Sequence, residues 1–371
     1  MKILYIAHNH PPKGAPLENM GGMQRVSMQL VAEFKKREDV EVVTLVQEVP
    51  WKGIEWRTAL FLIRLSMQLP GIVAKEKPDV ILFSSMVTAS LAGLTRNRIS
   101  VPMVTINHGH DVKLRVGVYQ KYLPKVFRAL NGVISVSSAT RDECIKRGMD
   151  PEKGIALPNG FDVEDFQINF SKSEARERLM SLLGLDFGDK KILVTVGRQV
   201  KRKGHAWFIK TVWPLIKENV VYLAIGDGPE HDKLKELRES VNNKEHIILA
   251  GRQPDEVLSM AYAAADLFIM PNVPVEGDME GFGIVLLEAN LANTPAIASD
   301  LEGIKDVIVN GKNGYKVADN NEVKFASRID TTLQNGLEDL SISAKEFVFE
   351  NFTWNKVADR YISYLKRVSE N

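Results

Sequence analysis

The sequence of 371 residues contains one cysteine, Cys144, and no long uninterrupted apolar run. A single cysteine cannot form a disulfide within the chain, and this scarcity is typical of proteins in a reducing compartment. Residues 59–69 are largely apolar, but an arginine and a glutamine interrupt them, and they are fewer than the ~20 residues that cross a bilayer. The apolar run at 3–7 ends at His8 and does not match a secretory signal. We therefore expect a cytoplasmic protein.

Several chemical signatures are also missing from the sequence. The lone cysteine and the 7 histidines show no zinc-ligand spacing. There is no Gly-x-Ser-x-Gly turn of the kind that presents a nucleophilic serine, and there is no Walker loop for a nucleoside triphosphate. These absences argue against a zinc enzyme, an α/β-type serine hydrolase and a P-loop ATPase.

Charge is unevenly distributed although the net charge is only +1. Residues 1–159 hold 22 Lys and Arg against 14 Asp and Glu, a balance of +8, whereas residues 160–371 hold 26 against 33, a balance of −7. A basic first half suits an anionic surface or acceptor, and the alternative is uneven surface charge without a partner. The length suits two domains, and the 44% apolar and 26% charged residues are typical of a globular protein.

Short apolar runs alternate along the chain with segments of helical periodicity, such as 24–36, 140–147, 205–217 and 231–241. The predicted strands of a first sheet are 2–7, 41–46, 80–83, 103–106 and 132–136, and those of a second are 192–196, 220–225, 247–250, 267–270 and 295–298. This alternation predicts parallel sheets with right-handed crossovers, whose ligands bind at the carboxyl ends of the strands. Turn residues at 158–162 indicate a linker. We therefore expect an α/β fold of two Rossmann-like domains, 1–160 and 161–353, facing a central cleft.

Two carboxylates lie eight residues apart in the segment 280–288, which reads Glu-Gly-Phe-Gly-Ile-Val-Leu-Leu-Glu. The two glycines suit a tight turn that lets a ligand approach the backbone, and 283–293 is predicted to be the helix that follows. The helix N-terminus favours phosphate or sugar oxygens. Glu280 and Glu288 could then hold two ends of a long polar ligand. The alternative is a buried helix with two carboxylates at its rim.

Four cations occupy six positions after the predicted strand 192–196, at Arg198, Lys201, Arg202 and Lys203. Arginine and lysine both neutralise phosphate oxygens. A short loop cannot turn four long side chains onto one phosphate, so Lys201 and Arg202 are expected to face solvent. The alternative is a solvated basic loop.

These features, in this order along nearly the whole chain, resemble the retaining glycosyltransferases of family 4, which have the GT-B fold and an E-x7-E motif. The resemblance implies that Arg198 and Lys203 stabilise the donor diphosphate and that Glu288 binds the ribose hydroxyls. It also implies that the sugar hydroxyls are held by Glu280 and the backbone amides of Gly281, Phe282 and Gly283.

Other positions match the family more loosely. Gly226, in a Gly-x-Gly turn, would lie near the nucleotide, and Arg252 in the loop that meets the base. Gly22 belongs to a paired-glycine loop that closes over the donor and acceptor in the family. His108 matches the histidine that orients the transferred ring better than His110 does. Three further expectations are that Arg141 meets an acceptor anion, that residues 354–371 form a helix crossing back to the first domain, and that the reaction needs no metal.

The expected reaction moves a hexose from a nucleoside diphosphate sugar to the hydroxyl of a glycan or lipid-linked acceptor, with retention at the anomeric carbon. Residues 276–283 look like a loop of mannosyltransferases that use GDP-mannose, and UDP-hexoses remain alternatives. No Asp-x-Asp pair flanked by strands is present, and the cations would replace a metal cofactor. We expect no nucleic-acid partner. The rival interpretations are a GT-B epimerase acting on UDP-sugars and a noncatalytic nucleotide-sugar-binding protein.

The segments 51–69 and 113–128 combine cations with apolar residues. Such surfaces bind anionic lipid head groups while burying apolar side chains shallowly, which would place the protein at the inner face of the membrane. The alternative is that both segments pack against the first sheet.

Overall fold

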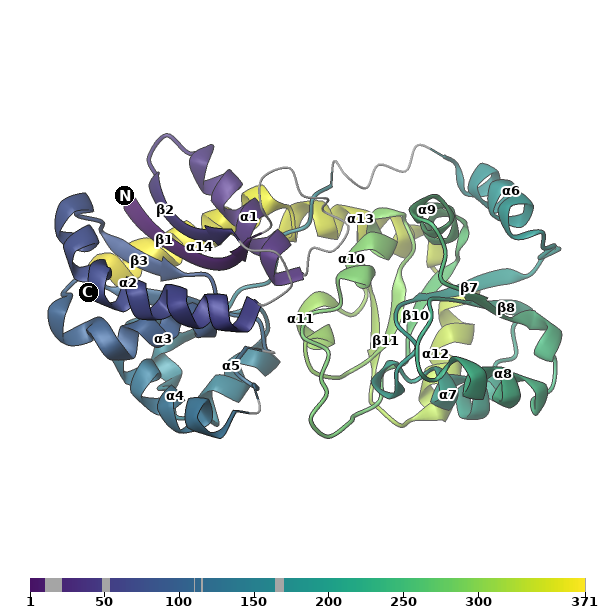
Figure 1. The fold of residues 1–371 in the computed structure, drawn as a ribbon. Helices are drawn as coiled ribbons and strands as arrows, with labels where there is room; N and C mark the ends of the chain where they lie inside the picture. Colours follow the sequence, from purple (N-terminus) through teal and green to yellow (C-terminus); the bar gives the residue numbers. More distant parts are fainter. Residues whose placement is uncertain (11–21, 49–53, 110, 115, 164–169, 371) are drawn as a thin grey trace. The chain divides into compact units, whose positions relative to one another are not determined.

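The computed structural model describes the chain except residues 11–21, 49–53, 110, 115, 164–169 and 371. Two compact units divide it: Met1–Gly160 together with Trp354–Asn371, and Phe161–Thr353 (Figure 1). Each unit is a six-stranded parallel sheet covered by helices. The predicted α/β fold with two parallel sheets is therefore confirmed.

The first unit is built on a sheet with the strand order β2-β1-β3-β4-β5-β6. Its strands are β1 (Lys2–His10), β2 (Glu41–Glu48), β3 (Val80–Phe83), β4 (Met103–Asn107), β5 (Gly132–Ser135) and β6 (Gly154–Ala156), and its helices are α1 (Gly22–Lys35), α2 (Ile54–Glu76), α3 (Met86–Thr95), α4 (Gly117–Ala129), α5 (Ser138–Ile145) and α14 (Trp354–Glu370). Successive side chains of a strand point to opposite faces, so Leu4 and Ile6 pack with α2, α3 and α4, whereas Ile3 and Tyr5 pack with α1 and α14.

The second unit has the strand order β12-β11-β10-β7-β8-β9. Its strands are β7 (Lys191–Val196), β8 (Val220–Ile225), β9 (Ile247–Gly251), β10 (Leu267–Met270), β11 (Ala296–Ser299) and β12 (Gly314–Val317), and its helices are α6 (Lys172–Leu183), α7 (His205–Trp207), α8 (His231–Glu239), α9 (Asp255–Ala264), α10 (Ile284–Leu291), α11 (Ile304–Val307), α12 (Glu322–Gln334) and α13 (Leu337–Asn351). One face of the sheet packs with α6, α9, α10, α11 and α13. The other face packs with α7, α8 and α12.

Two features of the fold differ from the sequence-based prediction. The edge strands β6 and β12 were not predicted, because they have three and four residues and are only partly buried. The predicted helix 205–217 is broken into α7, a π-helical turn at Phe208–Val212 and a 3-10 turn at Trp213–Leu215. Pro214 has no N–H to donate to the carbonyl four residues earlier, which explains why an α-helix does not continue to 217.

Among the described residues, no helix combines the length and the apolar character that a membrane crossing requires.

Candidate functional site

The second sheet has a topological switch point between β7 and β10, where the strand order turns from β7-β8-β9 to β10-β11-β12. Open parallel sheets bind ligands outside the carboxyl ends of their strands at such a point. Arg198 and Lys203 follow the end of β7, and Glu280 follows the end of β10. The strand order thus brings the predicted phosphate-binding cations and the first glutamate to one edge of the sheet.

The carboxylate of Glu280 is the centre of a charged cluster at this edge. Lys203 Nζ and Arg202 Nη1 each lie 2.6 Å from Glu280 Oε2, and Asn272 Nδ2 donates to the same oxygen at 3.3 Å. Burial would raise the pKa of the Glu280 carboxyl, but the charges of Lys203 and Arg202 and the hydrogen bonds from Lys203 and Asn272 lower it below its usual range. The other oxygen, Oε1, receives no hydrogen bond from the described residues. Glu280 is therefore ionised with one oxygen available to a ligand.

Arg202 does not face solvent, so that prediction was wrong. Its side chain is 20% exposed, and its Nε donates to Asp278 Oδ1 at 3.0 Å while Nη1 reaches Glu280. The partners lie 76 and 78 residues away along the chain, which is why the local sequence gave no sign of them. Lys201, next to it, is exposed as predicted.

The loops after β7 and β8 are tied together through Gln199, which the sequence analysis did not single out. Gln199 is fully buried, its Nε2 donates to the Gly226 carbonyl at 2.9 Å, and its Oε1 lies 2.7 Å from His231 Nδ1. A Cβ at Gly226, which has φ +133°, would overlap the Gly197 carbonyl oxygen. The glycine in this turn is thus required by the close approach of two backbone segments.

The turn at 281–283 leads into α10, which begins at Ile284 after Gly283 in the left-handed conformation, with φ +81°. The ring of Phe282 lies in the core, 6.0 Å from that of Phe352, so only its backbone is at the turn. Gly281 is partly buried at the same turn. Further along α10, Tyr262 donates its hydroxyl to Glu288 Oε2 at 2.7 Å. The tyrosine, on α9, is a positioning group that sequence reasoning missed.

Two of the predicted cations are exposed. Arg198 and Arg252 make no hydrogen bond or ion pair with other side chains in the described part of the chain. Arg252 follows Gly251, the last residue of β9. An arginine without an internal partner at the carboxyl edge of a parallel sheet is available to an anionic ligand.

The first sheet has its own switch point, between β1 and β3. Here His8 is 6% exposed with Nδ1 3.4 Å from Ser85 Oγ, and His10 Nε2 lies 2.8 Å from Ser27 Oγ. Burial, with smaller effects of nearby His10 and His108, lowers the pKa of His8 to about 4. The histidines at this edge therefore include one that stays neutral near pH 7. The sequence analysis had considered only His108 and the undescribed His110.

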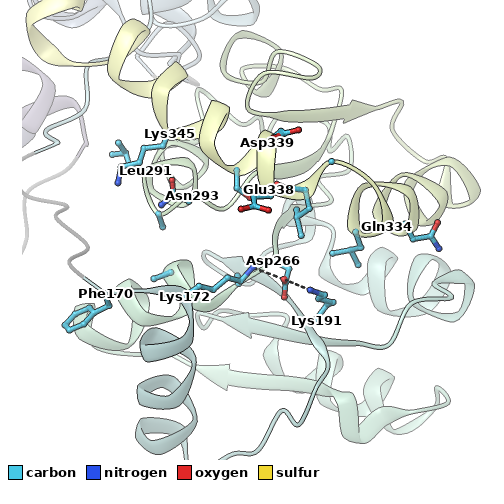
Figure 2. Close-up of a pocket in the computed structure, with 17 residues that line it drawn as sticks. Phe170, Lys172, Lys191, Asp266, Leu291, Asn293, Gln334, Glu338, Asp339 and Lys345 are labelled. Atoms are coloured by element: carbon cyan, nitrogen blue, oxygen red, sulfur yellow. Dashed lines mark hydrogen bonds and ion pairs between the residues drawn. The ribbon is translucent and has the colours of Figure 1, made fainter.

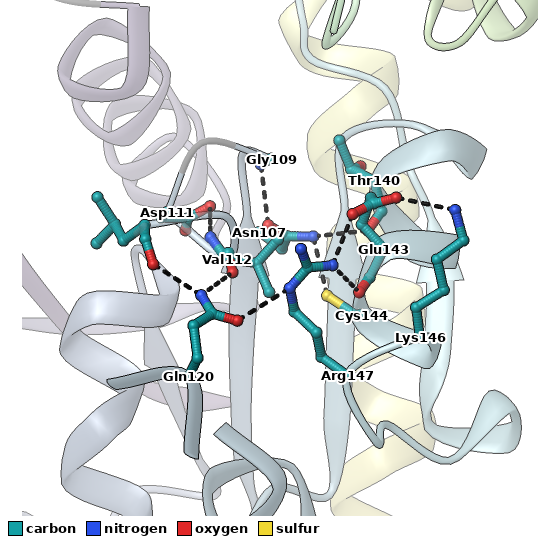
Figure 3. Close-up of polar contacts among 11 residues, drawn as sticks. Asn107, Gly109, Asp111, Val112, Gln120, Thr140, Glu143, Cys144, Lys146 and Arg147 are labelled. Carbon is teal, nitrogen blue, oxygen red and sulfur yellow. Dashed lines mark hydrogen bonds and ion pairs between the residues drawn. The ribbon is translucent and has the colours of Figure 1, made fainter. Parts of the chain in front are cut away.

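His108 is held by the loop that follows β4. Its Nε2 lies 3.0 Å from the Ser84 carbonyl, which can only accept, so Nε2 carries the proton. Figure 3 shows how the loop is fixed: Asn107 Nδ2 donates to the Thr140 carbonyl at 2.9 Å and its Oδ1 accepts from Gly109 N at 2.9 Å. The carboxylate of Asp111 accepts from the backbone of His108 at 3.0 Å. The imidazole is thus preorganised by the protein's own hydrogen bonds.

The two remaining predicted residues of the first unit lie in different settings. Gly22 is the first residue of α1, and the paired Gly21 lies outside the described residues. Arg141 donates from Nε to the Gly154 carbonyl at 3.0 Å and from Nη2 to the Pro151 carbonyl at 2.9 Å. Its guanidinium therefore already holds the segment that leads into β6.

A cavity of about 650 Å³ lies elsewhere in the second unit and contains none of the predicted site residues. Its wall includes Asp266, which Lys172 approaches to 2.7 Å and Lys191 to 3.5 Å (Figure 2). Asp266 immediately precedes β10 and Lys191 begins β7, so this cavity lies at the amino ends of the strands. Ligands of parallel sheets bind at the opposite edge.

A parallel Rossmann-like sheet in each unit, with a charged cluster at the carboxyl edge of the second, is the architecture expected of a GT-B glycosyltransferase. Two family models match the chain: glycosyl transferases group 1 over residues 184–347, and glycosyltransferase family 4 over residues 20–165. The chain therefore belongs to the family 4 glycosyltransferases and is a transferase enzyme.

Similar proteins extend over the full length of the chain. An uncharacterized glycosyltransferase of Methanocaldococcus jannaschii is 26% identical over 402 residues, covering 100% of this chain and 99% of its own. A GDP-mannose-dependent α-(1-6)-phosphatidylinositol monomannoside mannosyltransferase of Mycolicibacterium smegmatis is 25% identical over 384 residues, covering 95% of each chain. The crystal structure of HepE from Anabaena in complex with UDP superposes with a TM-score of 0.70 at 17% identity, covering 99% of this chain and 100% of that one.

Proposed function

We propose that this enzyme transfers a hexose from a nucleoside diphosphate sugar to an acceptor hydroxyl, with retention at the anomeric carbon and without a metal. The observation that carries the proposal is the arrangement at the edge of the second sheet, where Lys203 lies against the largely buried carboxylate of Glu280 and the exposed side chain of Arg198 has no hydrogen bond or ion pair with the described residues. Cations and a carboxylate at one switch point suit a ligand that joins a diphosphate to a polyhydroxylated sugar.

Each part of the donor has a group suited to it. Arg198 and Lys203 would neutralise the diphosphate, whose charge grows as the bond to the sugar breaks. Glu280 Oε1 would accept from a sugar hydroxyl, and Glu288, oriented by Tyr262, would accept from the ribose. In the first unit, His108 would offer Nδ1 to a sugar hydroxyl, because its Nε2 is engaged with Ser84. No step requires a covalent enzyme intermediate, and the leaving phosphate itself would take the acceptor proton.

GDP-mannose is the proposed donor. The relative from Mycolicibacterium smegmatis is named as GDP-mannose-dependent and is similar over 95% of both chains. The loop 276–283 also resembles that of mannosyltransferases, and it includes Asp278 and Glu280 of the charged cluster. The base itself has no side-chain signature in the sequence, so UDP-hexoses are the comparison donors in the test.

The test is a panel of GDP-mannose, UDP-glucose, UDP-galactose and UDP-N-acetylglucosamine, with release of nucleoside diphosphate as the first readout. Release from GDP-mannose that increases on addition of a mannoside acceptor is the expected result, and NMR of the product would show an α-linkage. Conversion of a UDP-sugar into its epimer without acceptor would instead identify an epimerase. Tight binding without release from any donor would identify a noncatalytic binding protein.

We also propose that the acceptor is linked to a lipid and that the enzyme docks on an anionic membrane surface through α2. Trp56, Leu60, Ile63 and Met67 recur along one side of this helix and are 57%, 56%, 60% and 67% exposed. The opposite side of α2 already contributes to the core through Leu65, Leu69 and Val73. A helix that is apolar on both sides needs a second apolar partner.

Charge supports an anionic lipid surface as that partner. Arg57 lies over the Trp56 ring at 5.1 Å, and the exposed Arg64 follows Ile63 on the same helix. The segment 113–128 is a poorer candidate than the sequence suggested, because Leu123, Val126 and Phe127 of α4 are buried in the core. Trp51 and Lys52 lie outside the described residues.

Vesicle co-sedimentation tests the docking proposal. We expect binding to vesicles containing phosphatidylglycerol at low salt, weaker binding at high salt, and loss of binding in Leu60→Gln/Ile63→Gln/Met67→Gln. The matched control is Val323→Gln/Ile342→Gln, which removes side chains that are 64% and 53% exposed on α12 and α13. Equal binding of the two variants would contradict docking through α2.

A further inference from the structure

Arg202 bridges two carboxylates at the edge of the second sheet, although neither of them is near it in the sequence. Nε donates to Asp278 Oδ1 at 3.0 Å, and Nη1 donates to Glu280 Oε2 at 2.6 Å. The backbone joins the same segments, because Val273 N donates to the Arg202 carbonyl at 2.9 Å. The planar guanidinium fixes direction as well as charge, which a point charge cannot do.

The two oxygens of the Glu280 carboxylate differ: the protein contacts Oε2, whereas Oε1 is available to a ligand. Arg202, Lys203 and Asn272 all contact Oε2, and the backbone N–H of Glu280 donates to the carboxylate of Glu302. Oε1 accepts no hydrogen bond from the described residues. A carboxylate held through one oxygen presents the other in a fixed direction.

A second observation at the same place points to a ligand. Asn272 is 2% exposed, its Nδ2 donates to Glu280, and its Oδ1 is buried without a hydrogen-bond partner in the described residues. Buried acceptors in native proteins are normally paired with protein or ordered water. An acceptor left open on the amide group that donates to Glu280 Oε2 would be satisfied by a ligand hydroxyl or by the water that the ligand displaces.

We propose that Arg202 is a positioning residue for sugar recognition: with Asp278 it holds Glu280 so that Oε1 faces the transferred sugar, and it does not bind the diphosphate. This inference rests on the proposed function in assigning Glu280 to the sugar. Lys203 differs from Arg202 because it pairs with Glu280 and forms no ion pair with Asp278, so it is not part of the bridge between the two carboxylates.

If Arg202 positions Glu280 and does not bind the diphosphate, its removal should affect the intact sugar donor more than the nucleoside diphosphate product. In Arg202→Met we expect turnover with the sugar donor to fall about 10–100-fold, the range for losing a hydrogen bond to a charged group. The Kd of the nucleoside diphosphate, which lacks the sugar, should change less than about threefold. Arg202→Lys should recover activity only partly, because one ammonium cannot serve both carboxylates in the geometry of the fork.

Lys201→Met is the matched control, because it removes an adjacent cation that is exposed and has no side-chain partner in the described residues. It should behave as the wild type does. In a Glu280→Gln background, Arg202→Met should cause little further loss, since residues that act as a unit are not additive. Arg202→Met that weakens the nucleoside diphosphate as strongly as the sugar donor would overturn the inference.

A readout without any donor separates this inference from the proposed function. Selective labelling of Glu280 allows its carboxyl titration to be followed by carbon NMR in wild type, Arg202→Met and Lys201→Met. The titration should shift to higher pH in Arg202→Met alone. An unchanged titration of Glu280 would overturn the positioning role of Arg202 even if the enzyme is active. A shifted titration in an enzyme that uses no sugar donor would support the contact between Arg202 and Glu280 and refute the proposed function.

Discussion

The two units share a parallel six-stranded sheet but differ in the chemistry at their switch points. In the first unit this edge carries His8, His10 and serine hydroxyls, and burial keeps His8 neutral. In the second unit it carries Lys203, Arg202 and an ionised Glu280. A neutral edge suits hydroxyl groups, whereas a charged edge suits a diphosphate and a sugar at once.

The units also balance their charges differently. The second unit is acidic overall, yet Arg198, Arg202 and Lys203 follow β7 at the edge where the fold brings β7 and β10 together. The first half is basic overall, yet its switch point contains histidines rather than lysines. Net charge therefore does not locate this charged cluster, whereas the strand order does.

The largest effect is expected from removing the diphosphate cations. Arg198→Ala or Lys203→Ala should lower turnover on the order of 10²–10³-fold, the loss seen when one preorganised donor to a developing charge is removed. Arg198→Ala is the cleaner variant, because Lys203 also contacts Glu280. The measurement is steady-state release of nucleoside diphosphate, with Lys201→Ala as the control. Near-normal turnover in the double variant Arg198→Ala/Lys203→Ala would refute the proposed role of these cations in binding the diphosphate. It would also remove the basis for contrasting the edges of the two sheets.

A smaller effect, on binding rather than turnover, is expected at Glu288. Ribose contacts exist in the ground state and in the transition state, so Glu288→Ala should raise the Kd of the sugar donor and of the nucleoside diphosphate alike. Tyr262→Phe removes only the hydroxyl that orients Glu288 and should change both in the same direction by about 10-fold or less. Calorimetric titration with the nucleoside diphosphate measures this. An unchanged Kd in Glu288→Ala would exclude the ribose role.

The sequence predicted the alternation of strands and helices in two sheets better than it predicted the details of the site. Buried strands such as 80–83, 220–225 and 267–270 are continuous apolar runs and were found with their observed bounds. The edge strands β6 and β12 are short and partly exposed, so they lack that pattern. A helix ending at 217 was predicted from periodicity, but Pro214 removes a backbone donor.

Residues of the site were predictable only where their neighbours in the chain carried a signal. Glu280 stands beside a glycine turn, and Arg198 stands at a strand end. Local periodicity indicates neither contacts between residues distant in sequence nor the burial of a polar side chain. It therefore gave no sign of Arg202, Asn272 or Tyr262. Arg202 was assigned to solvent because a short loop cannot turn four long side chains onto one phosphate, and the structure gives it two carboxylate partners instead.

Among the described residues, each unit contains one buried histidine, which predicts a similar acid sensitivity in both. Burial lowers the pKa of His8 and of His205 to about 4, below the ordinary 6.5. The unfolded chain then binds more protons between pH 6.5 and 4, so the free energy of unfolding falls as pH decreases through this window. The loss is of order 3 kcal/mol for each histidine at most.

Hydrogen exchange at pH 7 and pH 5, followed peptide by peptide, separates the two units. His8→Asn should reduce the acid loss of protection in the first unit only, and His205→Asn in the second only. His246→Gln is the control, because His246 is partly exposed in a 3-10 turn before β9. If all three variants lose the same amount of hydrogen-exchange protection between pH 7 and pH 5, groups other than His8 and His205 govern the pH dependence.

The smallest expected effect is that of metal chelation, which should leave activity unchanged. At the switch point of the second unit, positive charge is already supplied by Arg198 and Lys203, which can stabilise the departing diphosphate as a divalent cation would. The nearby carboxylates Asp278 and Glu280 are engaged with Arg202, which competes with a metal for their oxygens.

Initial rates should therefore agree within error before and after dialysis against EDTA, and added Mg²⁺ or Mn²⁺ should not raise them. Arg202→Met provides the sharper version of the test, because it removes the guanidinium from both carboxylates, while Lys203 still contacts Glu280, and it would be the variant to gain a response to divalent cations. Activity of the wild type that is abolished by EDTA and restored by Mg²⁺ would mean that Asp278 or another carboxylate binds a metal with the donor. The charged edge of the second unit would then have to be reinterpreted as a metal site supported by cations.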